Sequence, residues 1–146
     1  MVKKTFTLAE AQTLLPVLEA LLLRAQQAAV RAAELELEME MLNRKIFLSG
    51  GMHVDVGSAS RRRAERDKAV GEASSTLSEI EEIGAKVHDL PMGLLDLPCQ
   101  VESGIVMLCW RMGEATIEHW HEESDEPSGR RPLDWRFGRG ERERLN

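Results

Sequence analysis

Two histidines near the end of the chain have the spacing of a metal-binding pair. His119 and His121 are separated by one residue, so on a β-strand both imidazoles point to one face, with Cα atoms about 7 Å apart. Two such imidazoles can share one zinc or iron ion, with a third ligand from Glu114, Asp96 or Glu122. No second tightly spaced cluster accompanies the pair. We therefore favour ordinary hydrogen bonds at a strand end, and we keep a divalent metal as the alternative.

Charged residues flank the same segment. Arg111, Glu114 and Glu118 combine two carboxylates with a guanidinium, a set that can perform acid–base catalysis on an anion held by the arginine. Cross-strand salt bridges explain the same residues without a ligand, and we favour that interpretation. The sequence contains no glycine-rich phosphate loop, no nucleophile elbow and no C-x-x-C motif. Whether the protein is an enzyme therefore stays open.

A lone carboxylate and two cysteines occur in apolar surroundings. Asp96 lies in the leucine-rich segment GLLDLP, and a buried carboxylate needs a partner, for which the candidates are Arg111, Arg130 and Arg131. Cys99 and Cys109 fit no zinc spacing and need no oxidising compartment. We expect both thiols to be reduced.

Short apolar segments predict the strands that carry these residues. Residues 105–111 form the best strand candidate, residues 116–121 the next, and Gly113 between them fits a type II′ hairpin turn. That turn sets a register in which the facing pairs are Trp110–Ile117, Leu108–His119 and Val106–His121. Earlier, residues 85–90 predict a short strand, and residues 93–98 predict another that stops at Pro98.

A long amphipathic segment precedes the strands. From Thr7 to Phe47, apolar residues recur in steps of three and four, the pattern of a heptad seam: Leu14, Leu18, Leu21, Ala25, Ala28, Ala32, Leu35, Met39, Leu42 and Ile46. Thr7 and Glu10 form a capping-box pattern at its start. Because the pattern crosses Pro16 without a change of phase, we favour one kinked, continuous helix, roughly 60 Å long.

A second helix is predicted from Ser58 or Ser60 to Ile83, with Gly84 as its C-terminal cap. Its apolar seam passes through Val70, Ala73, Leu77 and Ile80. The predicted fold is therefore α+β: a long, coiled-coil-like antiparallel helical hairpin (residues 1–84), a small antiparallel β-meander (85–128) and an arginine-rich C-terminal arm (129–146).

Composition limits the classes of partner. No apolar run reaches the length of a membrane span and no signal peptide is recognisable, so a cytoplasmic protein is expected. The formal net charge of −6 argues against nucleic acid as a partner. The C-terminal arm interleaves arginines with Trp135 and Phe137, which suits RNA binding or an unstructured terminus. We disfavour the RNA interpretation.

Several segments together resemble a known family. They are FTLAEAQTLLPVLEALL at 6–22, VHDL at 87–90, GLLDLP at 93–98, LCWRMGE at 108–114, IEHWH at 117–121 and GRRPL at 129–133. This combination is similar to the prokaryotic family called domain of unknown function 2203. The resemblance implies cytosolic proteins with a coiled-coil-like first half, and it implies no activity. This chain has Glu126-Pro127 where the family pattern leads us to expect Gly-Phe.

Two functions from different classes remain. The first is a non-enzymatic interaction module that self-associates as a dimer or larger homo-oligomer, because the long seam has few aromatic residues to cover it within one chain. The second is a small-molecule or metal-binding protein with a site at the 109–121 hairpin. The candidate residues are Asp96, Arg111, Glu114, Glu118, His119, His121, Arg130 and Arg131, with His119 and His121 as the metal ligands.

Overall fold

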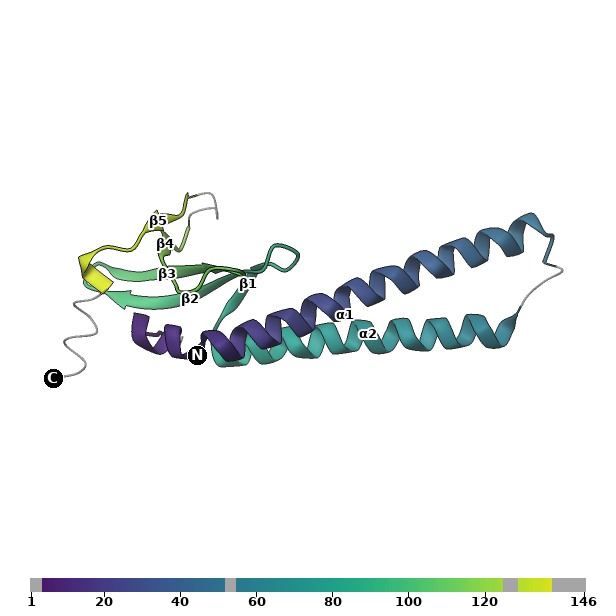
Figure 1. The fold of residues 1–146 in the computed structure, drawn as a ribbon, viewed down its shortest axis with the longest axis horizontal. Coiled ribbons are helices and arrows are strands. Elements are labelled where there is room, and N and C mark those ends of the chain that lie inside the picture. Colours follow the sequence, from purple (N-terminus) through teal and green to yellow (C-terminus); the bar gives the residue numbers. More distant parts are fainter. Residues whose placement is uncertain (1–3, 52–54, 125–128, 138–146) are drawn as a thin grey trace. The chain divides into compact units, whose positions relative to one another are not determined.

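The computed structural model describes residues 4–51, 55–124 and 129–137, and it has the predicted α+β architecture (Figure 1). Two long helices come first, α1 (Leu8–Leu48) and α2 (Val56–Ile83). A five-stranded antiparallel sheet follows, in the order β1 (Lys86–Asp89), β2 (Leu94–Val101), β3 (Gly104–Arg111), β4 (His119–Glu122) and β5 (Arg131–Pro132). The predicted meander is thus confirmed, and β5 extends it.

The signals at the start of α1 and at the end of α2 act as expected, whereas α2 begins at Val56, before the predicted Ser58 or Ser60, because the Asp55 carboxylate caps it by accepting from the Ser58 N–H at 3.0 Å. The Thr7 backbone N–H donates to the Glu10 carboxylate at 2.9 Å, and the Glu10 N–H donates to the Thr7 hydroxyl at 3.1 Å, which is a complete capping box. The helix continues through Pro16. Gly84 follows the last residue of α2 with a φ of 116°, a conformation that glycine adopts without strain.

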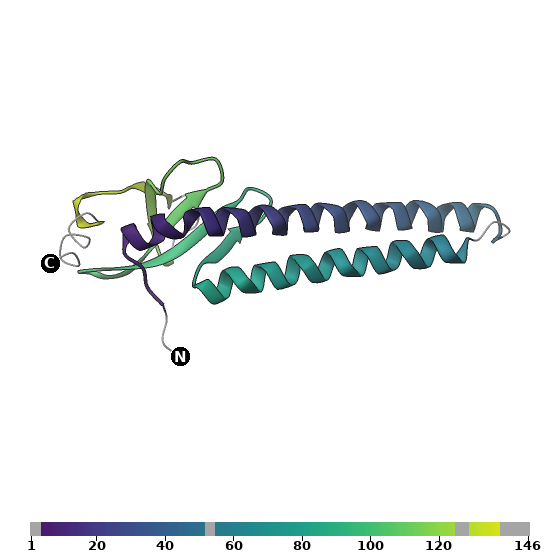
Figure 2. The same ribbon diagram turned by 60° about the horizontal axis from the view of Figure 1, so that its bottom comes forward.

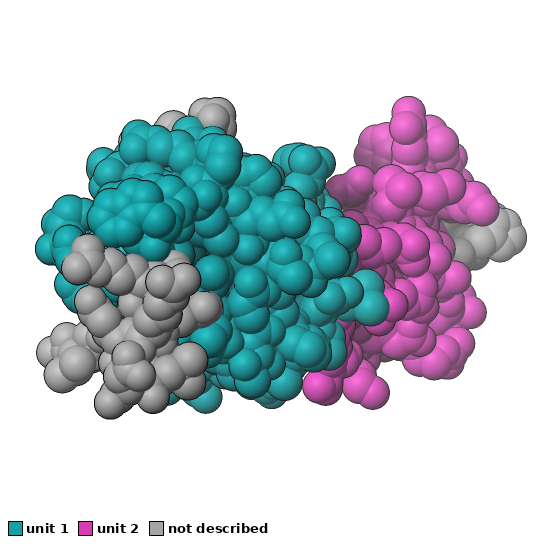
Figure 3. Space-filling model, turned by 60° about the vertical axis from the view of Figure 1, so that its left-hand side comes forward, with its two compact units in different colours: residues 1–23, 77–146 teal, residues 24–76 magenta. Residues whose placement is uncertain are grey.

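The two helices run antiparallel, as the second view also shows (Figure 2). The chain divides into two compact units, residues 1–23 with 77–146 and residues 24–76 (Figure 3). Within residues 24–76, ion pairs join the helices, Arg24 to Glu72 at 3.2 Å and Arg31 to Glu65 at 3.0 Å. All four side chains of these pairs are largely exposed, so each pair contributes little to stability.

The seam of α1 is covered inside one chain. Ala25, Ala28 and Leu35 are buried, as the heptad pattern predicts. The seam predicted for α2 needs correction, because Val70 is half exposed whereas Ala69 and Thr76 are buried. The buried row of α2 therefore passes through Ala69 and Thr76, both of which have small side chains.

One face of the sheet and the first turns of α1 make the core of residues 1–23 and 77–146. From α1 it takes Ala11, Leu15, Leu18 and Leu22, and from the strands Leu95, Leu97, Cys99, Val101, Val106, Leu108, Trp110 and Trp120. The strand residues alternate in sequence, so they share one face. The intervening residues, among them Asp96, Met107 and Cys109, point to the opposite face.

Pro98 does not end its strand, contrary to the sequence prediction. It lies inside β2 and faces Met107 of β3. Its carbonyl accepts a hydrogen bond from the Phe6 N–H at 2.8 Å. Since the N and O atoms of one residue in an antiparallel strand point the same way, the missing N–H of Pro98 is directed away from β3. The proline therefore removes no hydrogen bond between β2 and β3.

The predicted pairing of β3 with β4 is wrong by one residue. Met107 faces His121, Leu108 faces Trp120, and Cys109 faces His119. The connection is also longer than a type II′ turn, because β4 begins only at His119. A shift of one residue moves every side chain of a strand to the other face. It places both histidines on the face of Cys109 and Asp96 instead of the core face.

The first part of the C-terminal arm packs on β4. Arg131 pairs with Trp120 in the sheet, and the guanidinium groups of Arg131 and Arg136 lie 5.0 and 4.7 Å from the Trp120 ring centroid. The rest of the arm, residues 138–146, and the Glu126-Pro127 pair lie outside the described residues. Within the described part of the chain, no helix has the length and apolarity needed to cross a membrane.

Candidate functional site

The face of the sheet away from the core carries a row of polar side chains. Asp96 of β2 faces Cys109 of β3, and Cys109 faces His119 of β4. Facing residues of neighbouring strands share a face, so these three stand side by side, with His121 two residues further along β4. Side chains alternate between the two faces of a strand. The core therefore receives Leu95, Leu97, Leu108 and Trp110, and the residues between them form this polar row.

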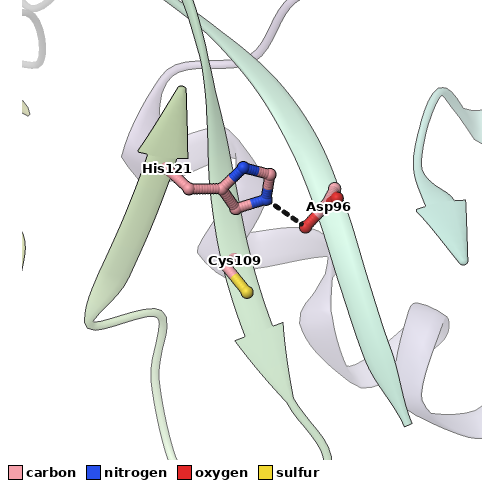
Figure 4. Close-up of side chains that lie close together, drawn as sticks. All are labelled: Asp96, Cys109 and His121. Atoms are coloured by element: carbon pink, nitrogen blue, oxygen red, sulfur yellow. Dashed lines mark hydrogen bonds and ion pairs between the residues drawn. The ribbon is translucent and has the colours of Figure 1, made fainter. Parts of the chain in front are cut away.

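Three of these side chains form a compact buried cluster, which we call the Asp–Cys–His cluster: Asp96, Cys109 and His121. Their exposed fractions are 2%, 1% and 2%. One ligand atom from each, a carboxylate oxygen, the sulfur and a ring nitrogen, lies within 4.8 Å of the other two. Figure 4 shows that the three side chains come from three neighbouring strands and that His121 and Asp96 point toward one another, with Cys109 beside them.

The hydrogen bonds of His121 define where its protons are. Its Nδ1 lies 2.7 Å from the Glu122 carbonyl oxygen, which can only accept, so Nδ1 carries a proton. Its Nε2 lies 2.9 Å from Asp96 Oδ1. A neutral imidazole with a proton on Nδ1 presents a lone pair at Nε2. Two lone pairs then face each other unless a second proton or a cation lies between them.

His88 makes a second contact to the same carboxylate. Its Nδ1 lies 3.0 Å from Asp96 Oδ2, so both oxygens of Asp96 are engaged by imidazoles. His88 is positioned by an irregularity in β1, where the pairing with β2 shifts between Val87 and Asp89. Such bulges redirect a side chain. The rings of His88 and His121 meet edge to face at 6.2 Å between centroids.

Burial keeps Cys109 in its thiol form when no cation is bound. Removal from water raises the pKa of the thiol to about 11, while the positive charge of Arg130 lowers this pKa and the negative charge of Asp96 raises it. A metal ion would replace the thiol proton, because thiolate sulfur is the form that binds metals. Arg130 therefore lies where it can help to hold a thiolate.

A second set of polar side chains, Glu114, His119 and Arg130, lies near the connection between β3 and β4. Glu114 accepts hydrogen bonds from the Arg130 guanidinium at 2.6 Å and from the Arg111 backbone N–H at 2.7 Å. Its other oxygen is 3.4 Å from His119 Nδ1. Glu114, in the connection between β3 and β4, therefore contacts both His119 of β4 and Arg130 at the start of the C-terminal arm.

Five of the eight predicted site residues are divided between two groups, and Arg111 takes part only through its backbone N–H. Asp96 and His121 are in the Asp–Cys–His cluster, whereas Glu114, His119 and Arg130 are in the second group. Asp96 pairs with two histidines and not with the arginines proposed from the sequence. Glu118 accepts from the Thr116 hydroxyl at 3.5 Å, and Arg131 stacks on Trp120.

Sequence reasoning missed two residues of this site, Cys109 and His88. Neither has a spacing relative to another ligand that marks a metal site, because the residues meet through strand pairing. A weaker signal was present. His88, Asp96, Cys109 and His121 each lie in one of the segments that carry the family resemblance, VHDL, GLLDLP, LCWRMGE and IEHWH.

Comparison with known proteins agrees with that resemblance. The model of a family described as uncharacterized conserved protein, DUF2203, matches residues 4–133, which include both polar groups. No curated protein and no solved structure matches the chain.

Proposed function

The chain belongs to the DUF2203 family of uncharacterised conserved proteins, and from its own side chains we propose that it binds a divalent metal of the zinc class. The ligands are Asp96 Oδ1, Cys109 Sγ and His121 Nε2. The family description names no activity, so the proposal stands on these side chains alone.

The observation that carries the proposal is the contact between His121 Nε2 and Asp96 Oδ1. Because Nδ1 donates to a backbone carbonyl, the neutral ring directs its lone pair at a carboxylate oxygen 2.9 Å away. Histidine ligands of metals donate their other ring N–H to a carbonyl or carboxylate in the same way. A cation between the two atoms satisfies both lone pairs.

The distances suit one small ion. Zinc binds nitrogen and oxygen at roughly 2.0 Å and sulfur at roughly 2.3 Å, so donors on one tetrahedral ion lie about 3.3–3.7 Å apart. The three donors here lie within 4.8 Å of one another, and His121 Nε2 and Asp96 Oδ1 are 2.9 Å apart. Small rotations about side-chain torsions would bring all three donors to the distances that zinc requires.

The chemistry of the donors selects the metal. A thiolate, an imidazole and a carboxylate together suit Zn²⁺ and related transition metals, whereas Mg²⁺ and Ca²⁺ prefer oxygen ligands alone. One thiolate and one carboxylate also neutralise a divalent charge, which matters in a site so far removed from water. His88 on Asp96 Oδ2 then orients the carboxylate ligand.

Two other interpretations, a doubly protonated His121 and a catalytic triad, explain fewer of the contacts among Asp96, Cys109 and His121 than a bound metal ion does. A doubly protonated His121 paired with Asp96 satisfies that contact but leaves the thiol of Cys109 without a role, and burying the ion pair costs desolvation energy. A catalytic Cys–His–Asp triad requires a histidine nitrogen for the thiol proton. Both nitrogens of His121 are already engaged, by Glu122 and Asp96.

The test is metal binding by the full chain after removal of metal with a chelator and dialysis against zinc. We expect one zinc ion per chain by elemental analysis, and a loss of binding in Cys109→Ser and His121→Ala. Cys99→Ser is the matched control, because Cys99 is a buried thiol on the core face. Wild-type protein that retains no zinc, or equal binding in Cys109→Ser, would contradict the proposal.

A second candidate function, self-association through α1, has its own observation. The seam is covered by α2, but another row of α1 is exposed and apolar, with Leu37 and Met41 at 57% and 58% exposure and Val30, Phe47 and Leu48 nearby in sequence. Contiguous exposed apolar surface is typical of protein–protein contacts. We therefore move the proposed contact from the seam to this row.

Light scattering tests this second candidate. We expect a mass of at least twice the chain for the wild-type protein and a smaller mass for the double variant Leu37→Glu, Met41→Glu. Because both side chains are already exposed, the variant should keep the helix signal in circular dichroism. A wild-type monomer at micromolar concentration would rule the candidate out.

A further inference from the structure

We propose that the bound metal keeps one coordination position open toward a cavity on the outer face of the sheet, and that this position takes the carboxylate group of a small organic acid. The inference rests on the metal function proposed above. Only three side chains make up the Asp–Cys–His cluster. Structural zinc sites have four protein ligands, whereas three ligands with an open position are typical of sites that bind a further molecule.

The cavity reaches the metal ligands. It has a volume of about 270 Å³, and its wall includes the polar side chains of Lys86, His88, Asp96 and His121. Two of the three proposed ligands, Asp96 and His121, are therefore part of its wall. A molecule in the cavity can approach an ion held between them, while Cys109 lies on the strand between β2 and β4.

The charges around the cavity favour an anion. A divalent ion with one thiolate and one carboxylate is neutral, so Lys86 on the wall adds a positive charge next to it. Lys86 faces Asp96 across the β1–β2 pair, and it forms no ion pair with any residue in the described part of the chain. Glu123 on the same wall opposes this attraction. We therefore expect modest affinity.

The remaining wall is apolar and small. The apolar side chains of Pro98, Ile105 and Met107 can pack against a short aliphatic chain. An inorganic anion has no such chain and would not bury this apolar surface. His88 is already held by Asp96 through Nδ1, so it borders the cavity while it orients the ligand. An organic acid of a few carbon atoms satisfies the metal, Lys86 and the apolar wall together.

Cobalt can report the open position. Co²⁺ occupies zinc sites with the same ligands, and its visible absorption depends on what is coordinated. We would load the full chain with Co²⁺ and titrate acetate, butyrate and inorganic phosphate separately. The expected result is a saturable spectral change with both carboxylates, with butyrate binding more tightly than acetate and than phosphate.

Variants separate the contribution of Lys86 from that of the metal ligands. Lys86→Met should weaken butyrate binding about two- to fivefold, the effect of losing one partly screened charge, and should leave Co²⁺ affinity unchanged. Lys68→Met, on α2, is the matched control and should change neither. An equal butyrate affinity in Lys86→Met would remove Lys86 from the site and overturn its role in attracting the anion.

The outcomes for the metal and for the ligand are distinguishable. A protein that binds no Co²⁺ contradicts the metal function itself. A protein that binds Co²⁺ with a spectrum that none of the three anions changes overturns the open position, and a changed spectrum in His88→Ala would then identify His88 as the fourth ligand. Phosphate binding more tightly than butyrate would overturn the choice of an organic acid.

Discussion

Asp96 shows how the cost of burial depends on partners. Its carboxylate is almost fully buried, with one histidine on each oxygen, but the two histidines differ in environment. His121 is buried, whereas the side chain of His88 is 28% exposed. Water can take the place of the His88 ring at Oδ2, but it cannot easily reach Oδ1 when His121 is removed.

We therefore predict unequal effects of removing the two histidines in metal-free protein. Without metal, a second proton must lie between His121 Nε2 and Asp96 Oδ1, so His121→Ala should lower the free energy of unfolding by about 3–5 kcal/mol, the range found when a buried ion pair loses one member. His88→Ala should lower it by about 1 kcal/mol. Urea unfolding measures both. In the Asp96→Ala background most of the His121 effect should disappear, and equal effects in both backgrounds would contradict the pairing.

The core-facing cysteine allows a prediction that does not involve metal. Burial raises the pKa of the Cys99 thiol to about 11, with Glu10 contributing in the same direction. A raised pKa means less thiolate at a given pH, and the thiolate fraction grows only as the pH approaches that value. Native Cys99 should therefore react with iodoacetamide at pH 8 about a hundredfold more slowly than an exposed cysteine. Mass spectrometry of alkylated peptides measures this, with denatured protein as the control.

At the scale of elements, the helices could be predicted because their signals are local. Thr7 and Glu10 mark a start within four residues, and Gly84 marks an end at one position. The strand register could not be predicted in the same way. The register depends on the length of the connection between β3 and β4. Glu114 in that connection accepts hydrogen bonds from the Arg111 N–H and from the guanidinium of Arg130, which lies 16 residues further along the chain.

The same distinction explains the candidate site. An H-x-H pair can be found by eye because its spacing is local, and it led to His119 and His121 together. The structure separates their roles, since His119 approaches Glu114 while His121 meets Asp96 and Cys109. The donor atoms on β2, β3 and β4 come together only because of the register of the strands. A shift of one residue between β3 and β4 would move His121 to the other face of the sheet.

Two glycines with similar backbone conformation should differ in their tolerance of a side chain. Gly84 and Gly104 have φ values of 116° and 129°, so alanine is strained at both by about 1–2 kcal/mol. At Gly84 a Cβ would also lie 2.9 Å from the Phe6 ring, whereas at Gly104 it meets nothing within 4 Å. Gly84→Ala should therefore destabilise the fold more than Gly104→Ala in urea unfolding. Equal losses would show that Phe6 moves aside freely.

At the scale of the whole molecule, the later part of the α1 seam, from Ala25 to Ile46, and the polar cluster belong to different compact units. The helical unit, residues 24–76, buries a narrow row of mostly small side chains, Ala25, Ala28, Leu35, Ala69 and Thr76, and carries exposed ion pairs between its helices. The sheet and the Asp–Cys–His cluster lie in the other unit. This division changes the interpretation of the long seam, which α2 covers, so the proposed contact with a second copy uses the exposed row through Leu37 and Met41.

The division also predicts where metal should stabilise the chain. A ligand that binds only the folded state stabilises it by RT ln(1 + [L]/Kd), about 2.7 kcal/mol at a hundredfold excess over Kd. All three proposed ligands are on β2, β3 and β4, so amide hydrogens in these strands should exchange more slowly with zinc. Amides of residues 24–76 open locally without breaking the cluster, and their exchange should be unchanged.

Hydrogen exchange with mass spectrometry measures this contrast, with EDTA to reverse it. Cys109→Ser, which should lose the protection, and Cys99→Ser, which should keep it, form the matched pair. Equal protection of sheet and helical unit by zinc would mean that the metal binds elsewhere or that both units open together. Protection confined to β2, β3 and β4 is expected because the cluster is the place where these three strands, and no part of the helical unit, supply the ligands.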